Sequence, residues 1–187
     1  MRERILATAT GMFVVRGYEG VAMREIAEAC GITKAALYYH FDGKPDLLNA
    51  VFISYLAEIA DVVDESAAHG AGERRLRWLV EQLFALPAER RAIMRLAMHE
   101  VSQLPPGQRA AFAADYRTRF LAPLQQMVAD GTATGDFVAK DPALVVRLLL
   151  GMLYPFFAPP GSGPDAGSDT VADLLDIFFH GLAHPRG

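Results

Sequence analysis

Residues 23–44 read MREIAEACGITKAALYYHFDGK, and this stretch predicts two short helices joined by a tight turn. Gly31 stands where the end of a helix requires a residue that tolerates positive φ. Thr33 is a suitable N-cap for the second helix, because its hydroxyl can accept a backbone N–H that has no partner within the helix. Leu37 and Phe41 lie four residues apart and share one face, which can pack back on the first helix.

The other side chains of the second predicted helix point away from that packed face. Small residues come early and aromatic and basic residues follow, in the set Lys34, Ala35, Ala36, Tyr38, Tyr39 and His40. Small side chains let a helix approach base edges closely, while hydroxyl, imidazole and ammonium groups reach phosphate oxygens. This outward set indicates a helix that lies in the major groove of DNA.

An ordered motif runs without a gap through the first quarter of the chain. Its positions are Gly17-Tyr18, Ile26-Ala27, Gly31-Ile32-Thr33-Lys34, Leu37-Tyr38-Tyr39-His40-Phe41 and Lys44-Pro45-Asp46-Leu47-Leu48. This motif resembles the DNA-binding head of the TetR (tetracycline-repressor) family. The resemblance implies an all-helical homodimeric regulator whose C-terminal domain binds a small molecule and forms the dimer. We therefore expect an all-α fold, with a three-helix helix-turn-helix head over residues 1–50 and a helical ligand-binding and dimerisation body over residues 51–187.

The candidate DNA contacts follow from side-chain chemistry and from the resemblance. Lysine can donate to guanine O6 and N7, so Lys34 is the candidate base reader, with a phosphate contact or a solvated side chain as the alternative. Tyr38 and His40 resemble phosphate-contacting positions of the family. Lys44 begins the next helix beside outward-facing backbone N–H groups, which together predict a phosphate clamp. The predicted DNA-binding set is Arg24, Thr33, Lys34, Ala35, Ala36, Tyr38, Tyr39, His40 and Lys44.

Two positions depart from the family pattern. Ser or Thr usually precedes the first helix of the motif, where the hydroxyl caps the helix and touches a phosphate, whereas this chain has Ala22. The loss of such a cap costs about 1 kcal/mol. Arg24 is the candidate to supply the phosphate contact instead, with a solvated arginine as the alternative. Gly43 is the second departure, at a position that is often a Ser cap.

The charge of the chain does not by itself favour DNA. The formal net charge is −4, and residues 1–48 carry six Lys or Arg against six Asp or Glu. No broad basic patch is therefore expected, and DNA binding must rest on a few well-placed cations. We expect modest non-specific affinity and a shallow dependence on salt.

Composition and the N-terminus indicate a cytoplasmic globular protein. Of the 187 residues, 52% are apolar and 21% charged, which is ample material for a core. The single Cys30 excludes an intramolecular disulfide and fits a reducing compartment. Residues 1–4 lead directly into an amphipathic helix, and no signal peptide is visible.

Apolar periodicity predicts the remaining helices. The expected spans are 2–16, 44–65, 73–86, 88–102, 107–129, 142–157 and 169–182. The helix over 44–65 joins the head to the body. Pro123 lies inside the span 107–129 and should kink that helix, because proline removes an intrahelical hydrogen bond. A kink beside bulky aromatic residues is a way to open a cavity.

The predicted body is rich in aromatic and thioether side chains. Many of these are core residues, yet a ligand pocket is also apolar with a few convergent polar groups. The chemistry favours a small apolar or aromatic effector that carries little charge. The predicted ligand-binding set is Tyr55, Trp78, Met94, Met98, His99, Tyr116, Phe120 and Tyr154.

The apolar run 142–160 is near the minimum length for a membrane span, but it contains Arg147 and four prolines. A helix buried from several sides is the better interpretation, and no membrane association is expected. Paired with residues 169–182, it can build a four-helix bundle across a twofold axis, as the family usually does. The predicted dimer interface is Leu144, Leu148, Met152, Leu174, Leu175 and Phe178.

The sequence offers little for catalysis or metal binding. His99-Glu100 lacks the second histidine of a zinc-protease helix, and no glycine-rich phosphate loop opens from a strand. The five histidines lack paired ligand spacing, so no metal and no cofactor are expected.

These observations predict a DNA-binding transcriptional regulator, interpreted as a repressor that a small apolar effector releases from a palindromic double-stranded operator. An activator remains open at this stage. The alternatives are a ligand-sensing helical protein with weak or lost DNA binding, suggested by the neutral head and Ala22, and a small helical enzyme, which lacks any nucleophile–base pair in the sequence.

Overall fold

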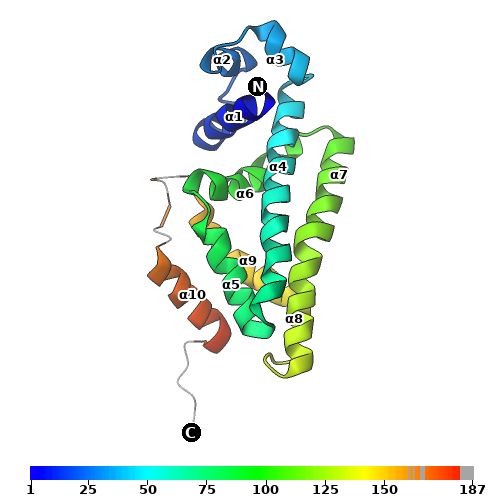
Figure 1. The fold of residues 1–187 in the computed structure, drawn as a ribbon, viewed down its shortest axis with the longest axis vertical. Coiled ribbons are helices and arrows are strands. Elements are labelled where there is room, and N and C mark those ends of the chain that lie inside the picture. The colour runs from blue at the N-terminus through cyan, green and yellow to red at the C-terminus, as the bar shows by residue number, and fades with distance from the viewer. Residues whose placement is uncertain (160, 162, 165–166, 182–187) are drawn as a thin grey trace.

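The computed structural model describes residues 1–159, 161, 163–164 and 167–181, and these residues form helices and connecting turns without any strand. Three helices form the head, namely α1 (Arg2–Arg16), α2 (Met23–Ala29) and α3 (Lys34–His40). They gather at one end of an elongated molecule (Figure 1). The expected all-α fold with an N-terminal helix-turn-helix is confirmed.

Local chemistry explains the turn between α2 and α3. Gly31 has φ of 61°, in the left-handed region that favours glycine. The Thr33 hydroxyl accepts the Ala36 N–H at 3.1 Å and so caps α3, as the sequence predicts. Leu37 and Phe41 are buried and join the core of the head.

The long helix α4 (Lys44–Glu65) connects the head to the rest of the chain. Leu47 and Leu48 belong to its buried face near the head, and Phe52, Tyr55 and Ile59 continue that face into the body. The boundary expected after residue 50 falls within this unbroken helix. The head and the body therefore share one continuous core along α4.

Helices α5, α6 and α7 of the body pack directly on α4. Helices α7 and α8 run beside it, while α5 and α6 lie on another side with α10 outside α5 (Figure 1). The α-helices are α5 (Gly72–Ala85), α6 (Ala88–Glu100), α7 (Pro106–Tyr116), α8 (Ala122–Thr134), α9 (Pro142–Leu153) and α10 (Ser168–His180). Shorter turns are η1 (Ser66–His69), η2 (Val101–Gln103), η3 (Arg117–Leu121) and η4 (Tyr154–Phe157). Residues 182–187 of the expected body lie outside the described residues.

The segment around Pro123 differs from a simple kink. A π-helical turn, η3, lies between α7 and α8, and the Ala122 N–H donates to the Arg117 carbonyl five residues back. Proline has no N–H to continue the α-helical ladder, and its ring clashes with the carbonyl four residues earlier. The wider π-helical turn lies just before Pro123 and accommodates both the missing N–H and the bulk of the ring. Helices α7 and α8 therefore continue in one direction as a long rod.

No helix within the described part of the chain is long and apolar enough to cross a membrane. The apolar helix α9 begins at Asp141, whose carboxylate accepts the Ala143 N–H at 3.1 Å. Pro142 then occupies the first helical position, as the sequence predicts.

Candidate DNA-binding surface and ligand cavity

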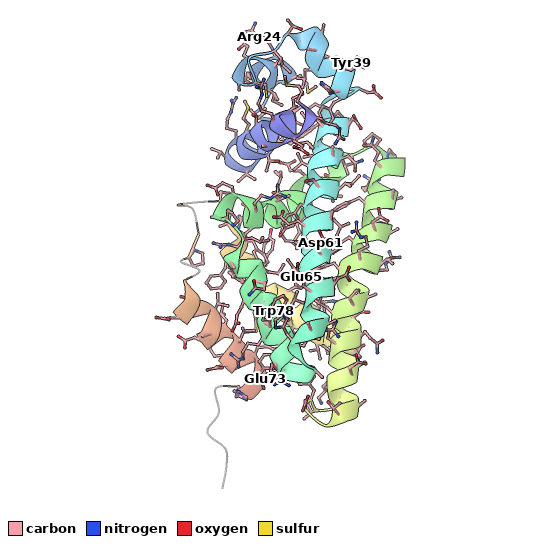
Figure 2. All side chains as sticks on the ribbon, viewed as in Figure 1. Arg24, Tyr39, Asp61, Glu65, Glu73 and Trp78 are labelled. Atoms are coloured by element: carbon pink, nitrogen blue, oxygen red, sulfur yellow. The ribbon has the colours of Figure 1, made fainter. Side chains whose placement is uncertain are left out.

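Helix α3 presents its outward face at the far end of the head. Tyr39 is 86% exposed and Tyr38 is 41% exposed, whereas Leu37 on the opposite face is fully buried. Lys34 and Ala35 are also exposed. Figure 2 shows Tyr39 and Arg24 at the end of the molecule remote from α10. The structure thus brings the candidate contacts of α3 together on one accessible surface.

The cations of that surface are not equally available. Arg24 pairs with Glu28 at 3.0 Å on the exposed side of α2. Lys34 places its Nζ 5.5 Å from the centre of the Tyr38 ring and forms no ion pair within the described chain. A phosphate contact by Arg24 therefore competes with Glu28, while Lys34 has no such competitor.

Lys44 lies at the start of α4, where its Nζ is 4.1 Å from the centre of the Tyr18 ring. This cation–π contact holds the ammonium over the Tyr18 ring. Asp46, however, lies in the same first turn and its carboxylate accepts the Asp42 N–H at 3.3 Å. The negative charge of Asp46 therefore lies beside the predicted phosphate clamp.

The expected loss of a side-chain cap at Ala22 is confirmed, yet the helix start is not bare. The Glu25 carboxylate accepts the Ala22 N–H at 2.7 Å and also pairs with Arg16 at 2.8 Å. The backbone hydrogen bond from Ala22, followed by the one from Arg16, lowers the pKa of Glu25. The hydrogen bond from the Ala22 N–H to Glu25, which is one half of a capping box, is therefore present although Ala22 has no hydroxyl to form the other half.

The body contains two cavities that share part of their lining. The α7 cavity, between α4, α6 and α7, has a volume of about 260 Å³, and the α9 cavity, bounded by α6, η3, α8, α9 and η4, has about 450 Å³. Met94, Met98 and Tyr116 line both. Tyr55 lines the α7 cavity and Tyr154 the α9 cavity. Five of the predicted ligand-binding residues are thus brought together.

Three predicted ligand-binding residues take other places. Trp78 on α5 lies outside both cavities and stacks on His69, with ring centres 3.8 Å apart. Phe120 is fully buried in the core and lines neither cavity. His99 also lines neither, but its Nε2 lies 2.8 Å from the Tyr154 hydroxyl. Trp78 and Phe120 are therefore corrected to structural positions, and His99 to a neighbour of the cavity wall.

The sequence interpretation missed two polar residues of the α9 cavity. Gln125 and Arg147 both line it. In the sequence, Arg147 counts only as the single charge of an apolar helix. The turn from α8 to α9 brings it over the cavity, which depends on a long-range contact that periodicity cannot show.

Burial raises the pKa of both tyrosine hydroxyls in the α7 cavity. Desolvation is the main cause at Tyr55, with the Glu58 charge adding to it. Desolvation alone raises the pKa of Tyr116 to about 12. Both groups therefore stay neutral in the folded protein at a pH where the unfolded chain begins to ionise.

The Tyr55→Phe variant should lose stability less steeply at alkaline pH than the parent protein. The neutral phenol stabilises the fold in full below the unfolded-state pKa of 10.0, and this contribution is lost as the pH rises through the folded-state pKa. Removing this group should reduce the loss in the free energy of unfolding by about 1.4 kcal/mol per pH unit at pH values just above the unfolded-state pKa of 10.0. Urea titrations at several alkaline pH values measure it, with Tyr39→Phe as an exposed control. Equal slopes for all three proteins would contradict the prediction.

Helices α9 and α10 expose an apolar face. Leu144 is 46% exposed, Leu148 55% and Ile177 39%. Met152, Leu174 and Phe178 of the predicted interface are half-buried, and Ile177 was not part of that predicted set. Leu175 is fully buried in the core of its own protomer, because it lies on the opposite face of α10, and it is removed from the interface set.

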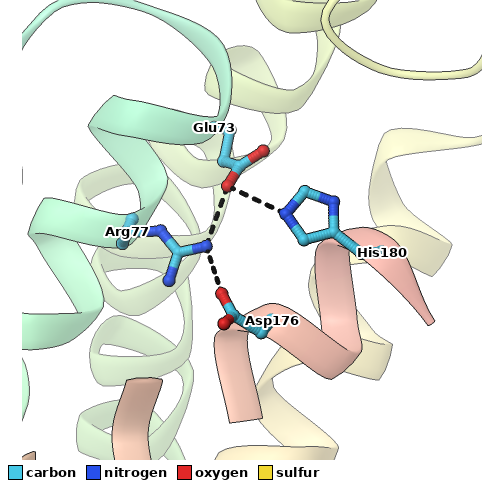
Figure 3. Close-up of polar contacts among 4 residues, drawn as sticks. All are labelled: Glu73, Arg77, Asp176 and His180. Carbon is cyan, nitrogen blue, oxygen red and sulfur yellow. Dashed lines mark hydrogen bonds and ion pairs between the residues drawn. The ribbon is translucent and has the colours of Figure 1, made fainter. Parts of the chain in front are cut away.

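A polar cluster fixes α10 on α5 (Figure 3). Arg77 donates at 2.8 Å to both Glu73 and Asp176, and His180 Nε2 lies 3.7 Å from Glu73. Arg77 thus bridges the two helices by a contact between residues far apart in the sequence. The exposed face of α10 is thereby held in a defined orientation.

Helix α6 connects the cavities with the head. It packs along α1, and the Tyr18 N–H points to the Glu100 carboxylate at 3.4 Å. Met94 and Met98 of the same helix line both cavities, and His99 contacts Tyr154. One rigid element therefore touches the cavity and the base of the head.

Within the described residues, no cluster of His, Cys, Asp or Glu has a geometry that suits a metal ion. Cys30 is a buried free thiol whose backbone carbonyl accepts a hydrogen bond from Arg4 at 2.6 Å.

Comparison with known proteins agrees with this architecture. Residues 5–51 match the model of the bacterial regulatory proteins of the tetR family, and residues 69–158 match a tetracyclin repressor-like C-terminal domain. The HTH-type transcriptional repressor KstR2 of Rhodococcus jostii is 27% identical over 191 residues, covering 99% of this chain and 92% of that protein.

Two solved structures extend the comparison. The TetR family transcriptional regulator PfmR from Thermus thermophilus superposes with a TM-score of 0.85 at 26% identity, over 97% of this chain and all of that one. AibR, solved in complex with isovaleryl coenzyme A and operator DNA, gives a TM-score of 0.82 at 25% identity, over 95% of this chain and 97% of that one. Head, body and their order along the chain thus agree with one group of proteins, and this chain belongs to the TetR family of transcriptional regulators.

Proposed function

We propose that the protein is a homodimeric, cytoplasmic repressor that a small effector releases from a palindromic operator. Residues 1–50 form the DNA-binding unit, and residues 51–187 form the ligand-binding and dimerisation unit. The observation that carries the proposal is the outward face of α3, where Tyr38 and Tyr39 are exposed beside Lys34 while Leu37 anchors the helix.

The side chains of α3 suit direct contact with duplex DNA. Ala35 and Ala36 allow close approach to base edges, and Lys34 is the candidate base reader. Tyr38, Tyr39 and His40 supply polar groups for phosphates, and Thr33 lies at the N-terminus of the same helix. The balanced charge of the head predicts that affinity comes from these few contacts and from dimerisation.

The apolar face of α9 and α10 provides the dimer contact. A twofold interface uses the same patch of both protomers, so Leu144 and Leu148 would meet their own copies. Dimers of helix-turn-helix proteins place their recognition helices about 34–36 Å apart, which is one turn of DNA. A palindromic operator follows from this symmetry.

Release by an effector can act through α6. A ligand in the cavities touches Met94 and Met98, and the end of the same helix contacts Tyr18 at the base of the head. If the ligand weakens DNA binding, it must bind the DNA-bound form less tightly by the same factor. The volume of the α9 cavity lies within the range of small-molecule sites.

The comparisons support both halves of the proposal. The repressor KstR2 aligns along nearly the whole chain, and AibR was solved in complex with isovaleryl coenzyme A and operator DNA. The alternative, a ligand sensor that has lost DNA reading, is favoured by the neutral head and by Asp46 in the predicted phosphate clamp.

Selection of genomic DNA fragments by the purified protein at near-physiological salt tests the proposal. A single enriched palindrome supports a regulator of a specific operator. No enriched motif contradicts it and supports the sensor.

The Lys34→Ala variant should relax the preference for one base pair in each half-site. A bidentate lysine–guanine contact discriminates by about 1–3 kcal/mol against the wrong base. Competition binding with operators that vary at each position measures this preference. Lys140→Ala, which removes the same charge outside the head, should leave the preference unchanged. A uniform loss of affinity on all sequences would instead make Lys34 a phosphate contact.

A further inference from the structure

The α7 cavity offers almost nothing to a polar ligand. Aliphatic, thioether and aromatic side chains line it, including Leu56, Met98 and Phe112, and its polar side-chain groups are the hydroxyls of Tyr55 and Tyr116. The Tyr116 hydroxyl is turned toward the Met94 sulfur at 3.9 Å. Burial of apolar surface is therefore the main gain available to a molecule that enters this cavity.

The α9 cavity has a different character on one side. Helix α9 contributes Arg147 to its wall, and α8 contributes Gln125. Of the residues described in the structure, none forms an ion pair or hydrogen bond with Arg147. Its guanidinium is exposed to water and presents a planar set of N–H donors that suits a carboxylate or a phosphate.

The two cavities adjoin each other along a shared part of their lining. Met94, Met98 and Tyr116 contribute to both, so the two cavities meet at these three side chains. Among the residues that the structure describes, no Asp or Glu lines either cavity. Together, the two cavities therefore combine the apolar lining of the α7 cavity with the single positive charge that Arg147 brings to the α9 cavity.

From this arrangement we propose that the effector is an anionic amphiphile, whose apolar chain fills the α7 cavity and whose carboxylate or phosphate group pairs with Arg147. The proposal rests on the effector site proposed above and narrows its ligand from weakly charged to anionic. A ligand with a neutral headgroup would cover the Arg147 guanidinium without pairing with its charge, and a cationic headgroup would be repelled by it.

Calorimetric titration of the full-length protein with matched ten-carbon probes tests the proposal. The probes are decanoate, decyl phosphate, decanol and decyltrimethylammonium, each below its micelle concentration. At least one anion should bind about tenfold to hundredfold more tightly than decanol, as expected for a charged hydrogen-bonded pair. The cation should bind more weakly than decanol. The better of the two anions identifies the headgroup as carboxylate or phosphate. Equal affinities for decanol and both anions would overturn the proposal.

Variants locate the two ends of the ligand. Arg147→Gln should bring the affinity for the anion down to that for decanol and leave decanol unchanged, while Arg147→Lys should keep part of the preference. Arg109→Gln, on the exposed side of α7, is the matched control and should have no effect. Ala113→Leu fills the α7 cavity and should shift the preferred chain from decanoate to hexanoate. An unchanged anion preference in Arg147→Gln would overturn the assignment of the headgroup.

Operator binding by the same protein preparations separates this inference from the proposed function. Anion binding by a protein that selects no DNA motif supports the ligand class and contradicts the operator role. Selection of a motif by a protein that does not prefer anions supports the regulator and overturns the ligand class.

Discussion

The Leu148→Asp variant is expected to be monomeric and to lose more than about a hundredfold in operator affinity. Leu148 is 55% exposed at the centre of the apolar face of α9, beside Leu144. Around a twofold axis each aspartate would lie near its own copy, so two like charges would be buried without partners, and burying an unpaired charge costs several kcal/mol. A monomer then offers one recognition helix instead of two.

Sedimentation velocity at micromolar concentration measures the oligomeric state, and a fluorescence binding assay measures operator affinity. Ile53→Asp is the control, because Ile53 on α4 is also an exposed apolar residue, at 45%, outside the proposed interface. It should leave the dimer intact. If Leu148→Asp remains a dimer, the interface lies on another face of the molecule.

The Phe52→Ala variant should reduce the free energy of unfolding by about 3–5 kcal/mol, the range for a fully buried phenylalanine. Phe52 is fully buried where α4 passes from the head into the body, and its ring lies 5.4 Å from that of Phe112 on α7. For a chain of this size, the midpoint of thermal unfolding should fall by roughly 6–20 °C. Because the core is continuous along α4, the head and the body should unfold together.

Two probes measure this cooperativity. Circular dichroism follows all helices, while the fluorescence of Trp78 on α5 follows the body. The two transitions should coincide in the parent protein and in Phe52→Ala. The neighbouring exposed residue provides the control, since Ile53→Ala should change the stability by no more than about 1 kcal/mol. Separate transitions would show that α4 does not couple the two units.

The head could be predicted closely because its signals are local. Gly31 marks a backbone conformation, Thr33 marks a cap, and Leu37 with Phe41 marks one face, and each depends on residues only a few positions away. The structure confirms all of these features. The same locality explains the prediction at Asp141-Pro142, where a cap and a proline together define the start of α9.

The cavity could be predicted only in part. Aromatic and thioether residues identified the right region, but the cavity-facing side of each helix depends on how the helices rotate against one another. Phe120 lies in the π-helical turn and is fully buried in the core, and the sequence does not reveal this turn. Arg147 can be recognised as a cavity residue only from the position of α9 against α8 in the structure. Such long-range placement leaves no periodic signal in the sequence.

The π-helical turn between α7 and α8 has a consequence for how such a protein can diversify. It holds one residue more than an α-helical turn, and each residue of an α-helix advances the direction of its side chains by roughly 100°. Deleting a single residue there would rotate the whole of α7 against α8, and Phe112 and Tyr116 would leave the cavity together. One deletion or insertion in Arg117–Leu121 can thus exchange an entire wall of the α7 cavity, whereas point substitutions would have to replace that wall residue by residue. A single-residue change in η3 can therefore alter the cavity lining while leaving the head and the candidate DNA contacts of α3 unchanged.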